Sequence, residues 1–154
     1  MMVGPEVEKT ALVRHCSRLF VTGANLTVPH FTIVLRKAYG LGAQAMAGGS
    51  FKEPMFTVAW PTGEFGGMGL EGQVKLGYRN ELAAIEDAEE RTARYEELVE
   101  RAYDRSRALN AGVSFGVDDV IDPMDTRRWI SGALSSVPKT NRRLEKKRRN
   151  VDTW

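Results

Sequence analysis

Residues 36–49 read Arg-Lys-Ala-Tyr-Gly-Leu-Gly-Ala-Gln-Ala-Met-Ala-Gly-Gly, and they follow the apolar run Phe-Thr-Ile-Val-Leu at 31–35. This pattern predicts a strand that ends in a glycine-bearing turn and continues into a helix of small residues. The backbone N–H groups in the first turn of a helix have no intrahelical partner, and the helix dipole is positive there. The junction is therefore a place where an anion or an oxyanion can be held.

The composition predicts one folded domain, since the chain has 154 residues, of which 42% are hydrophobic and 27% charged. No apolar run approaches the roughly 18 residues of a membrane-spanning helix. The first five residues lack the basic and apolar regions of a signal peptide. A single cysteine, Cys16, excludes an internal disulfide, and with two histidines it leaves no credible metal-ligand spacing. We therefore expect a soluble, cytoplasmic protein without a metal site.

Charge is distributed unevenly along the chain. Residues 138–154 hold seven basic and two acidic side chains, a net charge of +5, whereas the preceding 137 residues carry −3. A basic cluster of this kind can bind nucleic acid, but the rest of the chain is not basic, so we do not expect a nucleic-acid function. Because such a segment cannot bury enough apolar surface to fold, we expect residues 138–154 to be a disordered tail and residues 1–137 to form the folded domain.

Hydrophobic periodicity predicts helices and strands in alternation. Helices are expected at about 5–24, 42–47, 70–85, 87–109 and 122–134, and strands at about 30–36, 55–60, 64–68 and 117–121. Asp87 and Glu90 have the spacing of a capping box, so a new helix is expected to begin there. The segment Asn110–Gly112 is expected to end it, and Asp122 with Pro123 to begin the last helix. Strands that alternate with helices indicate an α/β fold.

Five segments, in order and with matching spacing, carry a resemblance to a known family. They are Val-Pro-His-Phe-Thr-Ile-Val-Leu-Arg-Lys-Ala-Tyr-Gly at 28–40, Met-Ala-Gly at 46–48, Ala-Trp-Pro at 59–61, Met-Gly at 68–69, and Val-Asp-Asp-Val-Ile-Asp-Pro at 117–123 followed by Asp-Thr-Arg at 125–127. The chain resembles the carboxyltransferase (beta) subunits of biotin-dependent acyl-CoA carboxylases, such as propionyl-CoA and methylcrotonyl-CoA carboxylases. The resemblance covers about residues 2–136 and implies a crotonase-like α/β fold.

The resemblance concerns only the C-terminal of the two crotonase-like domains in such subunits. It implies that a first domain, absent from this sequence, binds the acyl-CoA, and that this second domain binds carboxybiotin held on a separate carrier protein. The working site then lies between the first domain of one subunit and the second domain of its partner. The implied partners are an N-terminal carboxyltransferase domain, a biotin carboxyl carrier or biotin carboxylase subunit, acyl-CoA and further copies of this chain.

The resemblance also implies the site residues. The backbone N–H groups of Leu41 and Gly42 correspond to the catalytic oxyanion hole for the ureido oxygen of biotin. The positions implied to contact substrate are Tyr39, Gly40, Ala43 and Gln44. The biotin nitrogen takes the α-proton of the acyl-CoA in this scheme, which explains why the sequence shows no obvious side-chain base. Acyl selectivity does not carry over, because Gln44 stands where propionyl-type members have an aspartate.

Three functions remain open at this point. The first is the carboxybiotin-binding half of an acyl-CoA carboxyltransferase, either a natural split subunit or a piece of a larger gene product, and inactive as an isolated chain. The second is a non-catalytic remnant or assembly domain of the same family. The third is a stand-alone crotonase-like enzyme on CoA esters, which is weakened because no acid/base pair is apparent near the glycine turn.

Overall fold

A three-stranded parallel sheet lies at the centre of the molecule. The computed structural model describes residues 4–26 and 28–138. The order of the sheet is β1–β3–β5, with β1 at Phe31–Val34, β3 at Phe56–Ala59 and β5 at Asp119–Val120. Phe31 pairs with Phe56, and Val58 pairs with Asp119. Every residue of β3 is buried, as expected for a central parallel strand that is covered on both faces.

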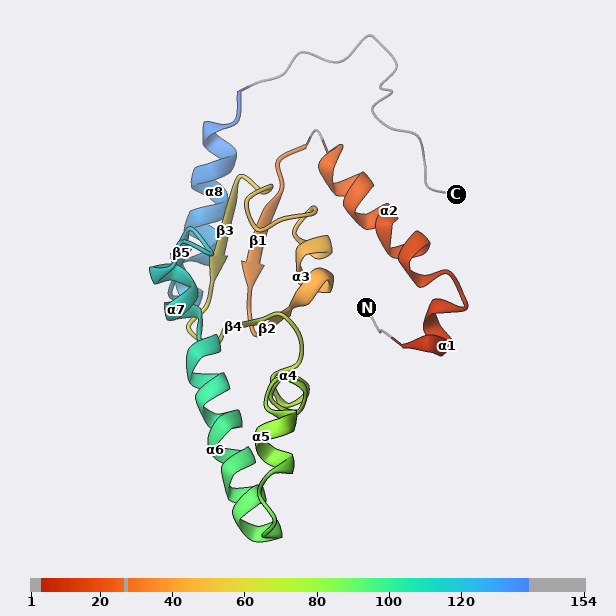
Figure 1. The fold of residues 1–154 in the computed structure, drawn as a ribbon. Helices are drawn as coiled ribbons and strands as arrows, with labels where there is room; N and C mark the ends of the chain where they lie inside the picture. Colours follow the sequence, from red (N-terminus) through yellow and green to blue (C-terminus); the bar gives the residue numbers. More distant parts are fainter. Residues whose placement is uncertain (1–3, 27, 139–154) are drawn as a thin grey trace.

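Helices cover both faces of this sheet (Figure 1). The helix α8 (Thr126–Ser136) lies on one face, where the ring of Trp129 meets the ring of Phe56 edge-on with 5.4 Å between their centroids. The helix α3 (Gly40–Met46) lies on the other face, and Ala108 at the start of α7 (Ala108–Val113) belongs to the apolar cluster on that face, together with Ala59 of β3 and Ala43 of α3. That second face is packed with small residues, since Ala38, Ala59 and Ala108 are all buried there. The small side chains let α3 and α7 approach the sheet closely.

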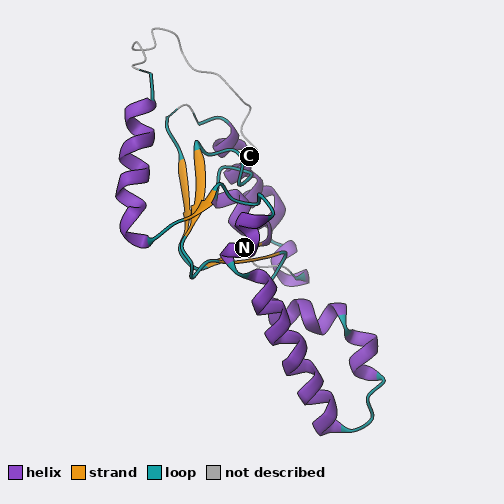
Figure 2. Ribbon diagram, turned by 90° about the vertical axis from the view of Figure 1, so that its left-hand side faces the viewer, coloured by secondary structure: helices purple, strands orange, loops and turns teal. Residues whose placement is uncertain are grey.

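A second, two-stranded parallel sheet connects this body to a helical hairpin. It pairs β2 (Lys37–Tyr39) with β4 (Glu64–Gly66). The hairpin consists of α4 (Leu70–Gly77), α5 (Arg79–Ala83) and α6 (Ala88–Ser106), and Figure 2 shows it extending away from the sheet. The hairpin has three nearly fully buried apolar side chains, which are each 2% exposed: Leu70 and Val74 on α4, and Leu98 on α6. Burying a side chain of this size stabilises a protein by roughly 1.5–3 kcal/mol.

The N-terminal helices pack against the body near the end of α3. These helices are α1 (Pro5–Glu8) and α2 (Leu12–Ala24), in place of the single helix predicted over 5–24. The break falls at Ala11, whose left-handed φ of 60° cannot continue a helix. Near the end of α2, a Cβ on Gly23 would lie 2.5 Å from the backbone of Gly48. Glycine at position 23 therefore allows α2 to pack directly on the chain that follows α3.

Tertiary hydrogen bonds end the long helix α6 earlier than predicted. The prediction that Asp87 begins it is confirmed, because its carboxylate accepts a hydrogen bond of 2.8 Å from the Glu90 N–H. At the other end, the predicted stop at Asn110–Gly112 is wrong, since α6 ends at Ser106 and α7 spans those residues. Arg107 is extended, with ψ at 143°, because the Ala108 N–H donates to the carbonyl of Gly63 at 2.8 Å.

Other boundaries also differ from the predictions. The strand predicted over 30–36 is β1, and a further strand that was not predicted, β2, follows it at Lys37–Tyr39 and pairs with a different partner. The helix predicted over 70–85 is broken between α4 and α5 at Tyr78, which follows a glycine of low helix propensity. The last helix is preceded by a short 3-10 turn, η1 (Pro123–Asp125), capped by Asp122. The predicted tail lies outside the described residues from residue 139 onward.

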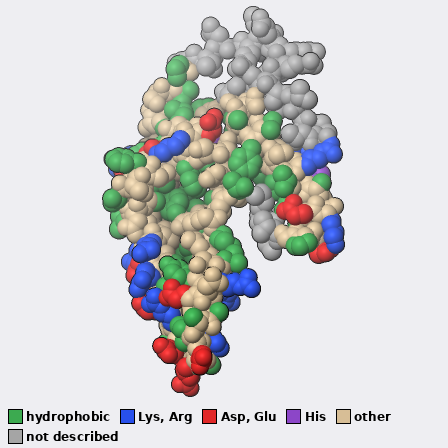
Figure 3. All heavy atoms as spheres, viewed as in Figure 1, with side chains coloured by type: hydrophobic (Ala, Val, Ile, Leu, Met, Phe, Trp, Pro, Cys, Tyr) green, Lys and Arg blue, Asp and Glu red, His purple; other side chains and the backbone are tan. Residues whose placement is uncertain are grey.

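Apolar and charged side chains occupy different parts of the surface. Figure 3 shows hydrophobic side chains gathered over the α/β body, whereas Lys, Arg, Asp and Glu side chains crowd the hairpin. The most exposed large apolar residues are Met124, Val113, Phe115 and Met46, at 90%, 82%, 81% and 75%. None of the helices within residues 4–26 and 28–138 is long and apolar enough to cross a membrane.

Candidate functional site

The predicted turn lies between β2 and α3. Tyr39 is the last residue of β2 and the residue that precedes the helix, and Gly40 is the first helical residue. The helix therefore begins two residues earlier than expected, so that Leu41 and Gly42 lie within its first turn rather than before it. The predicted order of a strand followed by a helix of small residues is correct, but the glycines predicted as a separate turn form the start of the helix itself.

Only glycine fits at position 40. Its φ is +57°, a left-handed value that side chains rarely adopt. In addition, a Cβ at this position would lie 2.6 Å from the carbonyl oxygen of Gly67. Both the turn and the close packing of its backbone against the loop after β4 therefore require the missing side chain.

The first turn of α3 presents free backbone donors. No side chain caps this helix end, because Tyr39 makes no capping hydrogen bond. The N–H groups of Leu41 and Gly42 point toward the preceding end of the helix, where the helix geometry supplies no carbonyl partner. These are the two groups that the family resemblance implies as an oxyanion hole.

A groove of about 610 Å³ runs along β1, β2 and α3. Of the predicted site residues, Tyr39, Gly42 and Ala43 line it. Gly40, Leu41 and Gln44 do not: the side chain of Leu41 is 58% exposed, and Gln44 is half-buried. The basic residues Arg36 and Lys37 line the groove as well, so its wall carries positive charge.

A partly buried hydrogen bond holds Tyr39, the residue before α3. The hydroxyl of Tyr39 donates to Oε2 of Glu64 at 2.6 Å. The two side chains lie on the same face of the two-stranded sheet, because Lys37 pairs with Glu64 and Tyr39 with Gly66. Burial, reinforced by the hydrogen bond and by the negative charge of Glu64, raises the pKa of the Tyr39 hydroxyl well above its ordinary value. Tyr39 therefore remains a neutral donor across the physiological range.

A second tyrosine–carboxylate pair lies close to the first and ties the two long helices of the hairpin together. The hydroxyl of Tyr103 on α6 donates to Oε1 of Glu71 on α4 at 2.5 Å. This hydrogen bond lowers the pKa of the Glu71 carboxyl and raises the pKa of the Tyr103 hydroxyl. The sequence analysis missed both pairs, because their members are 25 and 32 positions apart and no local pattern links them.

The chain matches the family described as "Carboxyl transferase domain" over residues 1–151. It is 36% identical over 131 residues to the methylmalonyl-CoA carboxyltransferase 12S subunit of Propionibacterium freudenreichii, a match that covers 85% of this chain and 24% of that subunit. It is 35% identical over 150 residues to a propionyl-CoA carboxylase carboxyltransferase subunit of Haloferax mediterranei, covering 96% of this chain and 28% of that one. The chain therefore spans about a quarter of the length of these relatives.

Solved structures agree in fold. One is a single-chain, multi-domain long-chain acyl-CoA carboxylase, with 55% identity and a TM-score of 0.74 over 86% of this chain and 13% of that one. Another is the transcarboxylase 12S hexamer with methylmalonyl-coenzyme A and methylmalonic acid bound, with 31% identity and a TM-score of 0.80 over 99% of this chain and 29% of that one. The prediction of a crotonase-like α/β fold is confirmed.

Replacement of Tyr39 by Phe should reveal the Tyr39–Glu64 hydrogen bond as a pH-dependent loss of stability. Losing this bond should lower the free energy of unfolding by roughly 0.5–1.5 kcal/mol at neutral pH. The pKa of the Tyr39 hydroxyl is raised from 10.0 in the folded chain. Above about pH 10 the unfolded state therefore releases the hydroxyl proton, whereas the native state still retains it. The hydroxyl's contribution is therefore complete below about pH 10 and decreases as the pH rises further.

The measurement is urea denaturation of the wild type and of Tyr39→Phe between neutral pH and about pH 11. Tyr95→Phe is the matched control, since the Tyr95 hydroxyl has no hydrogen bond to the described residues. The wild type and Tyr39→Phe should differ at neutral pH and begin to converge above about pH 10, while the control should follow the wild type. Superimposable curves for Tyr39→Phe and the wild type at every pH would contradict this role.

Proposed function

The chain belongs to the carboxyl transferase domain family, and from this premise we propose that it is the carboxybiotin-binding part of an acyl-CoA carboxyltransferase. The observation that carries the proposal is the uncapped first turn of α3, which follows a glycine held against Gly67 and borders a groove. A turn of this kind can hold an oxyanion without a catalytic side chain.

The residues around the groove fit the group that the family names imply. The groove volume, about 610 Å³, lies within the usual range of small-molecule sites, ~300–1,000 Å³. Arg36 and Lys37 supply positive charge for a carboxylate, and Gly42 and Ala43 leave the helix end accessible because their side chains are small. Carboxybiotin on a separate carrier would supply the activated carboxyl group.

The chain's own contribution is preorganised hydrogen bonding. The N–H groups of Leu41 and Gly42 would donate hydrogen bonds to the ureido oxygen of a bound biotin and so would stabilise negative charge on that oxygen. These N–H groups need no reorganisation, because the start of α3 is already held in place. Gly40 packs on Gly67, and the Tyr39 hydroxyl is hydrogen-bonded to Glu64. Preorganised donors of this type are usually the largest single electrostatic contribution to such reactions.

The proposed partners follow from the relatives. Their names include propionyl-CoA carboxylase and biotin-dependent acyl-coenzyme A carboxylase, so we propose an acyl-CoA substrate and a biotin carboxyl carrier or biotin carboxylase subunit as partners. An N-terminal carboxyltransferase domain, which would bind the acyl-CoA, completes the site. A cytoplasmic location fits these partners.

Carboxyl transfer should require the companion domain and the glycine turn. The 154-residue chain should be inactive alone and active when it is co-produced with the N-terminal carboxyltransferase part of a relative. In that complex, Gly42→Val should lower the rate of transfer from carboxybiotin by about 10²–10³-fold, because the new side chain displaces one donor. The matched control is Gly77→Val, at a helical glycine with nothing within 4 Å of its Cβ position.

Each outcome of this experiment separates the three functions that the sequence left open. Unchanged activity in Gly42→Val would show that the turn is only structural. Full activity of the chain alone would contradict the division of the site and indicate an independent enzyme on CoA esters. A soluble complex without transfer to any acyl-CoA would favour the non-catalytic assembly domain.

The chain should also self-associate. One structural relative is described as a hexamer, and the present chain exposes large apolar side chains on several elements, including Val113, Phe115 and Met124. Exposed apolar patches favour association. Light scattering at micromolar concentration should give a mass above 17.2 kDa that falls on dilution. Truncation after Val137 should leave this assembly unchanged, and a concentration-independent monomer would contradict it.

A further inference from the structure

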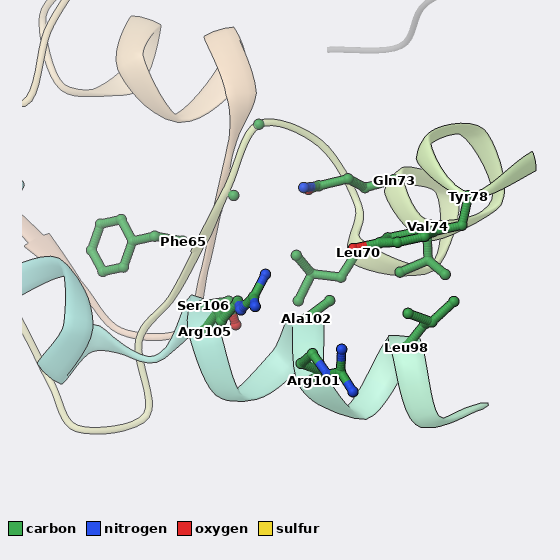
Figure 4. Close-up of a pocket in the computed structure, with 12 residues that line it drawn as sticks. Phe65, Leu70, Gln73, Val74, Tyr78, Leu98, Arg101, Ala102, Arg105 and Ser106 are labelled. Carbon is green, nitrogen blue, oxygen red and sulfur yellow. The ribbon is translucent and has the colours of Figure 1, made fainter. Parts of the chain in front are cut away.

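A small cleft separates β4 from the helical hairpin, away from the groove beside α3. Its volume is about 170 Å³, and its walls come from the Gly66–Gly67 segment, α4 and α6. Figure 4 shows the side chains of Gln73 and Arg105 extending into it from α4 and α6. No residue lines both this cleft and the groove. The cleft is therefore separate from the groove.

Positive charge at this cleft is only partly balanced by acidic residues. Arg101 and Arg105 both line it, and two like charges four residues apart on a helix repel one another. Arg101 donates to Glu97 at 2.7 Å, but within residues 4–26 and 28–138 the guanidinium of Arg105 has no ion pair. None of the residues that line the cleft is acidic. An anion placed here would relieve the repulsion and give Arg105 a partner.

The apolar floor of the cleft favours an anion that has an apolar part. Leu70 and Leu98 form part of it and are each 2% exposed, so this part of the wall offers no hydrogen bond. Inorganic phosphate needs donors around all of its oxygens, whereas an organic carboxylate has one polar end and one apolar end. The volume lies below the ~300–1,000 Å³ of sites for drug-sized ligands, so the occupant is small.

We propose that this cleft is a binding site for a short-chain organic carboxylate. The guanidinium of Arg105 binds the carboxylate through two parallel hydrogen bonds, a geometry that suits this pair. The Gln73 amide donates from the opposite wall, Arg101 adds charge, and the short aliphatic chain lies on Leu70 and Leu98. The proposal depends on this cleft alone and does not rest on the proposed carboxyl transfer.

The test is an NMR titration of the full chain with propionate, malonate, propionamide and inorganic phosphate. Propionate and malonate should produce saturable shifts at the Gly67 N–H and the Gln73 side-chain amide. Propionamide, which has the same shape without the charge, should produce none at equal concentration. Phosphate should bind more weakly than propionate, because it cannot use the apolar floor.

Propionate binding to three arginine variants tests whether the ligand occupies this cleft. Arg105→Gln should weaken propionate binding by about 10- to 100-fold, the effect of removing hydrogen bonds to a charged group. Arg101→Gln should weaken it less, because Arg101 is already paired with Glu97. The matched control, Arg127→Gln, removes a charge from an exposed arginine on α8 and should leave the affinity unchanged. All three arginines are exposed, so the variants should retain the wild-type spectrum elsewhere.

Four results would overturn the proposal. They are an absence of saturable shifts with propionate, equal binding of propionamide, tighter binding of phosphate than of propionate, and an affinity in Arg105→Gln equal to that of Arg127→Gln.

Discussion

The backbone contact between Gly40 and Gly67 is the constraint on which the candidate site depends. A Cβ at position 40 would lie 2.6 Å from the Gly67 carbonyl oxygen, and the φ of +57° at Gly40 is itself unfavourable for any other residue. A left-handed conformation costs about 1–2 kcal/mol for a residue with a side chain, before the steric clash is counted. The contact sets where α3 begins, and hence where its unpaired N–H groups point. Any residue larger than glycine at this position would force the backbone at the start of α3 or at Gly67 to shift.

Several independent elements converge on the loop that follows β4. The turn before α3 packs on Gly67, the ring of Tyr39 lies beside Gly66, and the cleft against α4 and α6 uses the same two glycines as one wall. The Tyr39–Glu64 hydrogen bond fixes one end of this arrangement, and the Tyr103–Glu71 hydrogen bond fixes the hairpin at the other. The first turn of α3 and the cleft lined by Arg105 therefore lie on two sides of one short segment, which links the α/β body to the hairpin.

The parts of the structure that the sequence predicted depend on local chemistry. Apolar runs predicted β1 and β3, the glycines predicted the turn, and the Asp87–Glu90 spacing predicted the start of α6. The missed features depend on distant partners: Gly63 accepts from Ala108 and ends α6, and β2 exists because β4 pairs with it. At the candidate site, the assignment of Leu41 and Gly42 depended on the family resemblance. No sequence pattern identified Arg105 as a binding residue, because an arginine on a charged helix is usually solvated.

Amide hydrogen exchange, read residue by residue by NMR, tests the free helix end most directly. If the first turn of α3 presents unpaired donors, the N–H groups of Leu41 and Gly42 should exchange at close to the rate of an unstructured chain. The N–H of Thr57, which donates to Asp118 at 2.7 Å in a buried strand, should be strongly protected in the same experiment. Protection of Leu41 and Gly42 comparable to that of Thr57 would mean that both groups already have partners within the chain, and it would contradict their role as an oxyanion hole.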